Sequence, residues 1–246
     1  MSALWITLAL LFNAGIYFYQ GPTKALEFLT GYLIELSLSV DNLFVFLLIF
    51  SHFKVPAAEQ SRILFWGVLG AQLMRLVFIL IGIALLQKFH WLVYILGFFL
   101  AAGGIKLLIH KDQEDAGESP IIRFCQKWFP QLSRFWLVLL IVELTDVVFA
   151  VDSVPAVLAI TKDPFIVYSS NVFAILGLRS LYFVLAGIMP LFRFLHYGLG
   201  VILVFVGLKM LLEHYISVPI VWALAFVAAT LTISVLSSLL FPPKKV

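Results

Sequence analysis

Five carboxylates stand inside apolar stretches of the sequence that are long enough to cross a lipid bilayer. They are Glu35, Asp41, Glu143, Asp146 and Asp152. A charge at the bilayer centre costs at least ~2.5–3.5 kcal/mol on the insertion scale, so five unpaired, ionised acids would cost on the order of ten kcal/mol. We therefore expect these groups to face the protein interior, to be partly protonated, or to hold cations.

The polar groups that accompany the five acids are also oxygen donors. They are the Asn42 amide and the hydroxyls of Ser37, Ser39, Thr145 and Ser153, with no cysteine or histidine among them. Oxygen-rich sites suit magnesium, calcium and manganese rather than zinc or copper. The excess of negative charge favours a divalent over a monovalent ion, so the residue types predict a divalent-cation site.

Helix geometry divides these residues into faces. Glu35, Ser39 and Asn42 share one face; Glu143, Asp146, Ala150 and Ser153 share another. Asp41 and Asp152 lie about 100–120° away around an unbroken helix with about 3.6 residues per turn. They join the same clusters if the helices unwind locally. Pro155 favours unwinding because a proline disfavours the α region at the preceding residue.

Two arginines inside apolar segments, Arg75 and Arg179, suggest an alternative to metal binding. Each could neutralise one acid and so lock the helices together in a structural network. Two arginines cannot balance five carboxylates, however, and ionisable groups within a membrane are functional candidates by default. A proton relay is a further alternative, and it is compatible with metal transport.

The elements that must position these residues are membrane-spanning helices. The chain is 63% hydrophobic and 12% charged, with a mean hydropathy of +1.10, whereas soluble domains are about half apolar and about a quarter charged. A spanning helix needs roughly 20 mostly apolar residues, and a β-barrel would show alternating strands instead. We therefore predict an all-α, polytopic transmembrane bundle with about eight spans. They run roughly over 3–19, 25–51, 62–87, 91–109, 135–160, 166–190, 194–213 and 217–241.

The longest connection, 110–134, combines an acidic stretch with a short amphipathic segment. Residues 120–135 carry apolar side chains at helical spacing with basic ones between them. This pattern is typical of a helix that lies at the membrane surface. Pro130 should break or kink this helix.

Lysine and arginine predict the orientation of the bundle. Nine of these residues fall in the loops on the side of the termini, against three on the other side. The nine are Lys54, Arg62, Lys111, Arg123, Lys127, Arg134, Arg193, Lys244 and Lys245; the three are Lys24, Lys88 and Lys162. The positive-inside rule then places both termini in the cytoplasm. Because these basic residues serve topology and the net charge is only +3, we expect no nucleic-acid partner.

Three matches in the same order reveal an internal repeat. Glu35–Asn42 matches Asp146–Ser153, Arg75 matches Arg179, and Gly104-Ile-Lys106 matches Gly207-Leu-Lys209. Each copy covers three spans, repeat one over about 25–109 and repeat two over about 135–213. Because three is odd, the second copy enters the membrane from the opposite side, as in the inverted repeats of secondary transporters. We therefore predict a single transporter domain over 1–246, with 110–134 as its cytoplasmic loop.

The motifs Glu35-Leu-Ser-Leu-Ser-Val-Asp41-Asn42 and Glu143-Leu-Thr-Asp146-Val-Val-Phe-Ala-Val-Asp152-Ser153-Val-Pro155-Ala resemble those of the TerC family of bacterial integral membrane proteins. Phe12-Asn13-Ala14-Gly15 and Arg179-Ser-Leu-Tyr-Phe are also similar to that family. The resemblance implies an inner-membrane manganese(II) exporter of the lysine-exporter-like superfamily, although the family is named for tellurium resistance. Many members carry a further span before the equivalent of the first span here.

The resemblance also implies a metal site. Its ligands would be Glu35, Asp41, Asn42, Glu143, Asp146, Asp152 and Ser153, with Ser39, Arg75 and Arg179 as supporting residues. We expect Asp41 and Asp152 to be the central ligands. The metal would be transported substrate, and no resident cofactor is expected.

The sequence therefore predicts a secondary transporter for manganese(II) or a similar divalent cation. We find no nucleotide-binding motif, and no paired nucleophile and base that would indicate an enzyme. Protons are the expected counter-ion, because metal and protons compete for carboxylate oxygens. The alternative is a metal sensor or scaffold that works with other proteins, such as a tellurium-resistance complex, without flux. Homo-oligomers and accessory proteins are both compatible with the sequence.

Overall fold

The computed structural model describes residues 2–109, 120–188, 194–212, 215 and 218–240. Within these ranges the secondary structure is helical, with no strand. Eight of the described helices have 18 residues or more: α1 (Ser2–Gln20), α2 (Pro22–His52), α3 (Ala57–Lys88), α4 (Leu92–Ile109), α6 (Arg134–Leu158), α7 (Pro164–Ile188), α8 (Leu195–Leu212) and α9 (Ile220–Leu240). A ninth, α5 (Pro120–Trp128), is short.

These eight helices coincide with the eight predicted spans, with ends that differ by a few residues. By length and apolarity alone, four of those in the described ranges qualify as membrane-spanning, namely α3, α4, α8 and α9. Many large apolar side chains on the outside of the bundle are exposed, among them Phe98 and Trp222. Such a surface suits lipid rather than water. The protein is an all-α, polytopic membrane bundle, as predicted.

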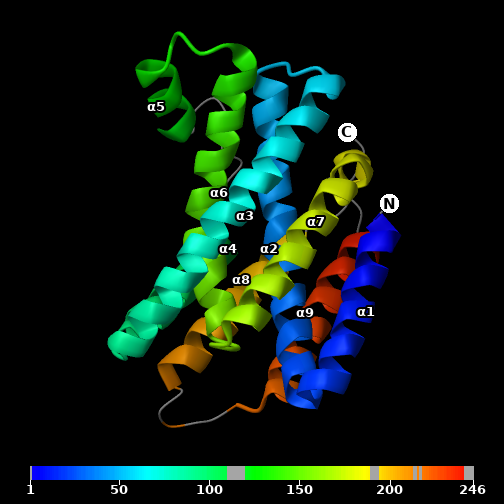
Figure 1. Cartoon of the computed structure of the whole chain (residues 1–246), viewed down its shortest axis with the longest axis vertical. Coiled ribbons are helices and arrows are strands. Elements are labelled where there is room, and N and C mark those ends of the chain that lie inside the picture. The colour runs from blue at the N-terminus through cyan, green and yellow to red at the C-terminus, as the bar shows by residue number, and fades with distance from the viewer. Residues whose placement is uncertain (1, 110–119, 189–193, 213–214, 216–217, 241–246) are drawn as a thin grey trace.

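The helices of the two repeats pack symmetrically: each contact that a helix of one copy makes with the other copy has an equivalent contact when the two copies are exchanged (Figure 1). The first copy is α2–α4 and the second is α6–α8. Helix α2 packs along α7, and its counterpart α6 packs along α3, while α4 pairs with α8. The outer helices α1 and α9 lie beside this six-helix unit.

The crossing of α4 and α8 shows the same symmetry between the copies in the contacts of single glycines. A Cβ atom on Gly104 would lie 2.7 Å from the carbonyl oxygen of Gly200, and one on Gly97 would lie 3.0 Å from that of Gly207. In the repeat, Gly104 corresponds to Gly207, and Gly97 stands seven residues earlier, as Gly200 does. The two contacts are therefore copies of one another, as an inverted repeat requires. Glycine permits this close approach because it has no side chain.

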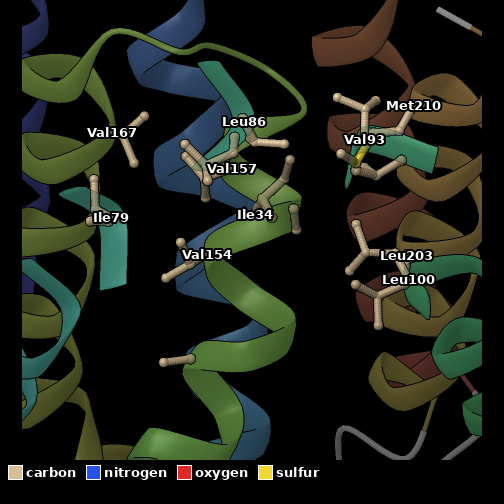
Figure 2. Packing of buried hydrophobic residues seen from close by; sticks show 14 of the residues in the cluster. Ile34, Ile79, Leu86, Val93, Leu100, Val154, Val157, Val167, Leu203 and Met210 are labelled. Carbon is tan, nitrogen blue, oxygen red and sulfur yellow. The ribbon is translucent and has the colours of Figure 1, made fainter. Parts of the chain in front are cut away.

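A hydrophobic core joins the two copies (Figure 2). Its buried members come from the six helices of the two copies, α2–α4 and α6–α8, with Val227 from α9. They include Ile34, Ile79, Leu86, Val93, Leu100, Val154, Val157, Val167, Leu203 and Met210. The polar motifs of α2 and α6 are therefore held in place by apolar contacts from both copies.

The bundle has two ends of different character, seen at the top and bottom of Figure 1. We call the upper one the basic end; it carries the α2–α3 turn, α5 and the start of α6. The opposite end carries the α1–α2 junction and the loop from α6 to α7. At that junction Gly21 adopts φ +92°, a left-handed conformation that favours glycine. Pro22 then begins α2 in the first helical turn, where its missing N–H costs nothing.

A short helix, α5, is present in the predicted amphipathic segment, and one of its faces packs on the bundle. Helix α5 ends before Pro130, as predicted. Ile122 and Cys125 are buried against the bundle, whereas Phe124 and Trp128 are exposed. The face with Ile122 and Cys125 packs on α6, and Phe124 and Trp128 lie on the outer side of α5.

The expected unwinding of the motif helices is wrong. Helix α2 runs without interruption through residues 35–42, and α6 continues through Pro155 to Leu158. The proline lies only three residues before the end of α6. A helix so close to its end can lose the hydrogen bond that proline cannot donate without breaking upstream.

Candidate metal site

A buried arginine of α3 lies at the meeting point of the two motif helices. The Arg75 side chain is 1% exposed. Its Nη1 forms an ion pair with Glu35 Oε1 and donates to Ser153 Oγ at 3.2 Å. Its Nε and Nη2 donate to the two carboxylate oxygens of Asp146 at 3.4 and 3.3 Å. One guanidinium therefore joins α2, α3 and α6.

The two acids on Arg75 are counterparts in the internal repeat. Glu35 opens the first motif and Asp146 opens the second. Each lies on the face of its helix that turns toward the other copy, because α2 and α6 are in contact. An inverted repeat places equivalent residues around one axis, so their convergence on a single cation follows from the architecture.

A small cavity borders this cluster on the side of the basic end. It measures about 20 Å³ and is lined by Ser39, Asn42, Arg75 and Asp146 together with apolar side chains. A cavity of this size holds about one water molecule. The faces predicted for Ser39, Asn42 and Asp146 are therefore correct, since all three reach the same space.

Two oxygens in the cluster are buried without a hydrogen-bond partner among the described residues. They are Glu35 Oε2 and Ser39 Oγ. A buried oxygen without a partner is costly, and both kinds of oxygen are suitable ligands for a hard divalent cation. The donor set around the cavity thus fits the ligand chemistry expected from the sequence.

The charges of the described cluster do not cancel. Arg75 contributes one positive charge, and Glu35 and Asp146 together contribute two negative charges when ionised. The structural alternative, with one acid for each arginine, is therefore not the arrangement around Arg75. An additional cation or a proton would complete the balance.

Glu143 shares the predicted helix face with Asp146 but lies beside a different part of α3. A Cβ on Gly70 would lie 2.0 Å from Glu143 Oε1, so the carboxylate occupies the space that this glycine leaves open. Within the described hydrogen bonds, Arg75 has none to Glu143. Glu143 therefore stands toward the basic end, more than one helical turn along α3 from Arg75.

Asp41, Asp152 and Arg179 lie on described helices, but their side chains fall outside the described part of the structure. Their predicted roles stay predictions. Because α2 is continuous, position 41 is about 120° around the axis from position 35. Among the residues that are described, no group of three or more histidine, cysteine, aspartate or glutamate side chains is close enough to hold a metal.

Three further polar residues in the spans escaped the sequence analysis. The side-chain amide of Gln72, Tyr32 OH and Asn171 Oδ1 have buried atoms with no hydrogen-bond partner among the described residues. Each is a polar residue within an apolar helix, and Asn171 follows two serines, Ser169 and Ser170; that is the signal that could have found them.

Comparison with known proteins agrees with the motifs. The model of the integral membrane protein TerC family matches residues 20–245, a range that contains both motif helices and Arg75. The chain belongs to the TerC family. No solved protein structure matches it significantly.

Several curated TerC-like relatives match nearly the whole chain. The Escherichia coli (strain K12) protein Alx is 46% identical over 95% of this chain and 81% of its own length; its name proposes a membrane-bound redox modulator. The Myxococcus xanthus membrane protein STKORF319 is 44% identical over 97% of this chain and 81% of its own length. A membrane protein of Rickettsia bellii is 39% identical over 96% of this chain and 82% of its own length.

Proposed function

We propose that this TerC family protein exports a divalent metal cation, manganese(II) above all, by alternating access between its two inverted copies. One observation carries the proposal. Two repeat-related carboxylates, Glu35 and Asp146, meet at a buried point where their charge exceeds that of Arg75. A site shared by both copies is one that relative movement of the copies can open to either side.

Arg75 acts in this proposal as the cation that holds the empty site together. The metal would bind Glu35 Oε2, Ser39 Oγ and neighbouring oxygens, with Asp41, Asp152, Asn42, Glu143 and Ser153 as further ligands. Arg75 would then release at least one carboxylate, because two cations at one pair of acids repel each other. Competition of metal and protons for the same oxygens supports protons as the counter-ion.

The distribution of basic residues supports an orientation for the protein in the inner membrane. Arg62, Arg123, Lys127 and Arg134 belong to the basic end, with the α2–α3 turn and α5. The positive-inside rule favours this end as cytoplasmic. In this orientation the opposite end, with the α1–α2 junction, faces the outside.

The name of the Escherichia coli relative proposes a redox role, but this chain has few thiol groups that could carry out redox chemistry. The sequence contains one cysteine, so a single chain cannot form a disulfide. Burial raises the pKa of the Cys125 thiol, and the thiolate is the reactive form. Metal transport is therefore the better-supported proposal.

Flux in proteoliposomes containing only this protein tests the proposal. We expect manganese(II) to move into an interior that holds a metal-sensitive fluorophore, and a pH gradient to change the rate. Glu35→Gln should abolish flux. Glu59→Gln is the matched control, because Glu59 pairs with Arg134 at the surface, far from the site. Manganese binding without flux in the wild-type protein would instead support the sensor or scaffold.

A further inference from the structure

A second ionic cluster closes the opposite end of the bundle. Lys24 Nζ lies 2.9 Å from Glu27 Oε2 and 3.1 Å from Asp163 Oδ2. Thr161 Oγ1 donates to the same Glu27 oxygen at 2.6 Å. Lys24 and Glu27 belong to the first turns of α2, whereas Thr161 and Asp163 belong to the loop between α6 and α7. The cluster therefore ties the first copy of the repeat to the second.

This cluster lines a wide polar cavity. The cavity measures about 600 Å³, and its wall includes Lys24, Glu27, residues 158–164 and Lys209. Lys209 Nζ donates to the carbonyl oxygen of Ala159 at 2.6 Å and so holds the start of the loop. The cavity beside Arg75 is far smaller, at about 20 Å³. The opposite end thus has room for a hydrated ion, whereas the buried cluster does not.

One face of α2 connects the wide cavity to the buried site. Glu27, Gly31 and Glu35 follow one another at four-residue spacing, so each lies about 40° around the helix from the one before it. Glu27 and Glu35 are eight residues, or about 12 Å, apart along the axis. Only the turn that contains Gly31 lies between them.

At Gly31, helix α2 comes close to Ser170 of α7 and to Val157 of α6. A Cβ on Gly31 would lie 3.0 Å from Ser170 Oγ and 3.2 Å from a methyl group of Val157. The neighbouring residues of α2 and α7, Tyr32 and Asn171, carry the buried unpartnered atoms described above. The contact between α2 and α7 at Gly31 therefore lies along α2 between the wide cavity and the buried cluster of Glu35.

We propose that the wide cavity is the outward opening of the cation path and that the ion pairs of Lys24 with Glu27 and Asp163 are its latch. This proposal rests on the proposed function, because it concerns the route to the Glu35 site. With the latch closed, Lys24 holds the start of α2 against the α6–α7 loop, and its positive charge opposes a leaving cation. With the latch open, α2 separates from α7 at Gly31 and the buried site reaches the cavity.

The exposure of the latch suits a device that opens and closes. The side chains of Lys24, Glu27 and Asp163 are 32%, 15% and 28% exposed. Ion pairs that remain in contact with water stabilise a structure only weakly. The latch therefore biases the closed state without locking it.

Cysteine labelling from the outside tests the latch without any need for transport. Ser170→Cys, in a Cys125→Ser background, places a thiol of similar size at the contact with Gly31. A membrane-impermeant thiol reagent should label it slowly in the latched protein. Asp163→Asn should raise the labelling rate on the order of fivefold, the effect of losing one such pair, and Lys24→Gln should raise it further because two pairs are lost.

The controls separate the latch from general loosening and from the transport proposal. Glu59→Gln breaks a more exposed ion pair, the one with Arg134 at the basic end, and should leave the rate unchanged. The charge exchange Lys24→Asp with Asp163→Lys should restore slow labelling. Unchanged rates in both single variants, or an equal rise with Glu59→Gln, would overturn the latch. Failure of manganese flux with a responsive labelling rate would overturn the proposed function instead.

Discussion

Two ionic clusters of this protein have similar kinds of residues but differ in their exposure to solvent. In each, one basic residue lies between an acid of the first repeat and an acid of the second, with a hydroxyl beside them. Arg75 holds Glu35 and Asp146 where its side chain is 1% exposed. Lys24 holds Glu27 and Asp163 where its side chain is 32% exposed.

Because the two clusters differ in burial, we expect them to have different functions. Breaking a buried ion pair by removing one partner costs about 3–5 kcal/mol, because the other charge remains buried. Breaking an exposed pair costs about 0–1 kcal/mol. A planar guanidinium can also bind a carboxylate through two N–H groups at once, whereas an ammonium is a compact and well-hydrated charge. The buried cluster therefore suits a site that binds tightly, and the exposed one suits a gate.

Removal of Arg75 should have the largest effect. Arg75→Gln leaves Glu35 and Asp146 buried without their cation and should reduce the free energy of unfolding by about 3–5 kcal/mol. Thermal unfolding in detergent would measure the loss. Manganese(II) should raise the Tm of the variant more than that of the wild type, because the metal can replace the missing charge. A Tm equal to that of Lys24→Gln would erase the distinction between the clusters.

Loss of single acids should separate the two clusters by metal affinity. Glu35→Gln and Asp146→Asn should each weaken manganese(II) binding by about 10- to 100-fold, the range for one charged contact of about 1.5–3 kcal/mol. Asp41→Asn and Asp152→Asn should abolish binding while the protein still folds. Glu27→Gln should leave the affinity unchanged within about twofold, as expected for loss of an exposed pair. Calorimetric titration would measure these values, and equal losses at Glu27 and Glu35 would contradict the assignment.

The close contact between α2 and α7 at Gly31 can be tested by adding a side chain there. Gly31→Ala places a methyl group 3.0 Å from Ser170 Oγ and should cost about 1–3 kcal/mol of stability by overpacking. Ser170→Ala in the same chain should restore most of the loss. Thermal unfolding of the single and double variants gives the coupling between the two sites. Simple addition of the two effects would mean that Gly31 and Ser170 do not share this contact.

Changes in salt and pH should have only small effects on the latch, and these effects identify the groups that close it. Burial tends to raise the pKa of Asp163, but hydrogen bonding and charge from Lys24, with two backbone N–H groups, bring it below its usual 3.8. Burial tends to lower the pKa of Lys24, but Glu27 and Asp163 bring it above its usual 10.5. The Asp163 contribution is thus lost only as pH falls through its lowered pKa, and that of Lys24 only as pH rises through its raised pKa.

The thiolate is the form that reacts, so the raw labelling rate rises with pH; the pH effect on the latch is the labelling rate of Ser170→Cys divided by that of Ser170→Cys with Lys24→Gln. This ratio should be constant between about pH 5 and 8, a window that lies between the usual pKa values of Asp and Lys. Raising the salt from about 0.1 to 1 M should increase it modestly, because the Debye length falls from about 10 to 3 Å. A steep rise at pH 5 without a salt effect would mean that another group closes the cavity.

The sequence by itself determined the spans, the repeat and the face of each motif helix. A bilayer demands long apolar helices, so the blocks in the sequence defined α1–α4 and α6–α9 to within a few residues. Helical periodicity placed Glu35, Ser39 and Asn42 together, and an odd number of spans required the second copy to be inverted. These features depend on properties of one helix at a time, or on the membrane that surrounds all of them.

Only the tertiary structure decided which polar groups meet. Periodicity defines where a side chain points on its own helix but not which helix lies opposite, because rotation about the axis is set by packing with neighbours. Arg75 thus pairs with two acids rather than one, and Glu143 lies beside Gly70 instead. From the sequence, Lys24 is one of the basic residues in a loop. In the fold, its Nζ lies 3.1 Å from Oδ2 of Asp163, which is 139 positions later in the chain.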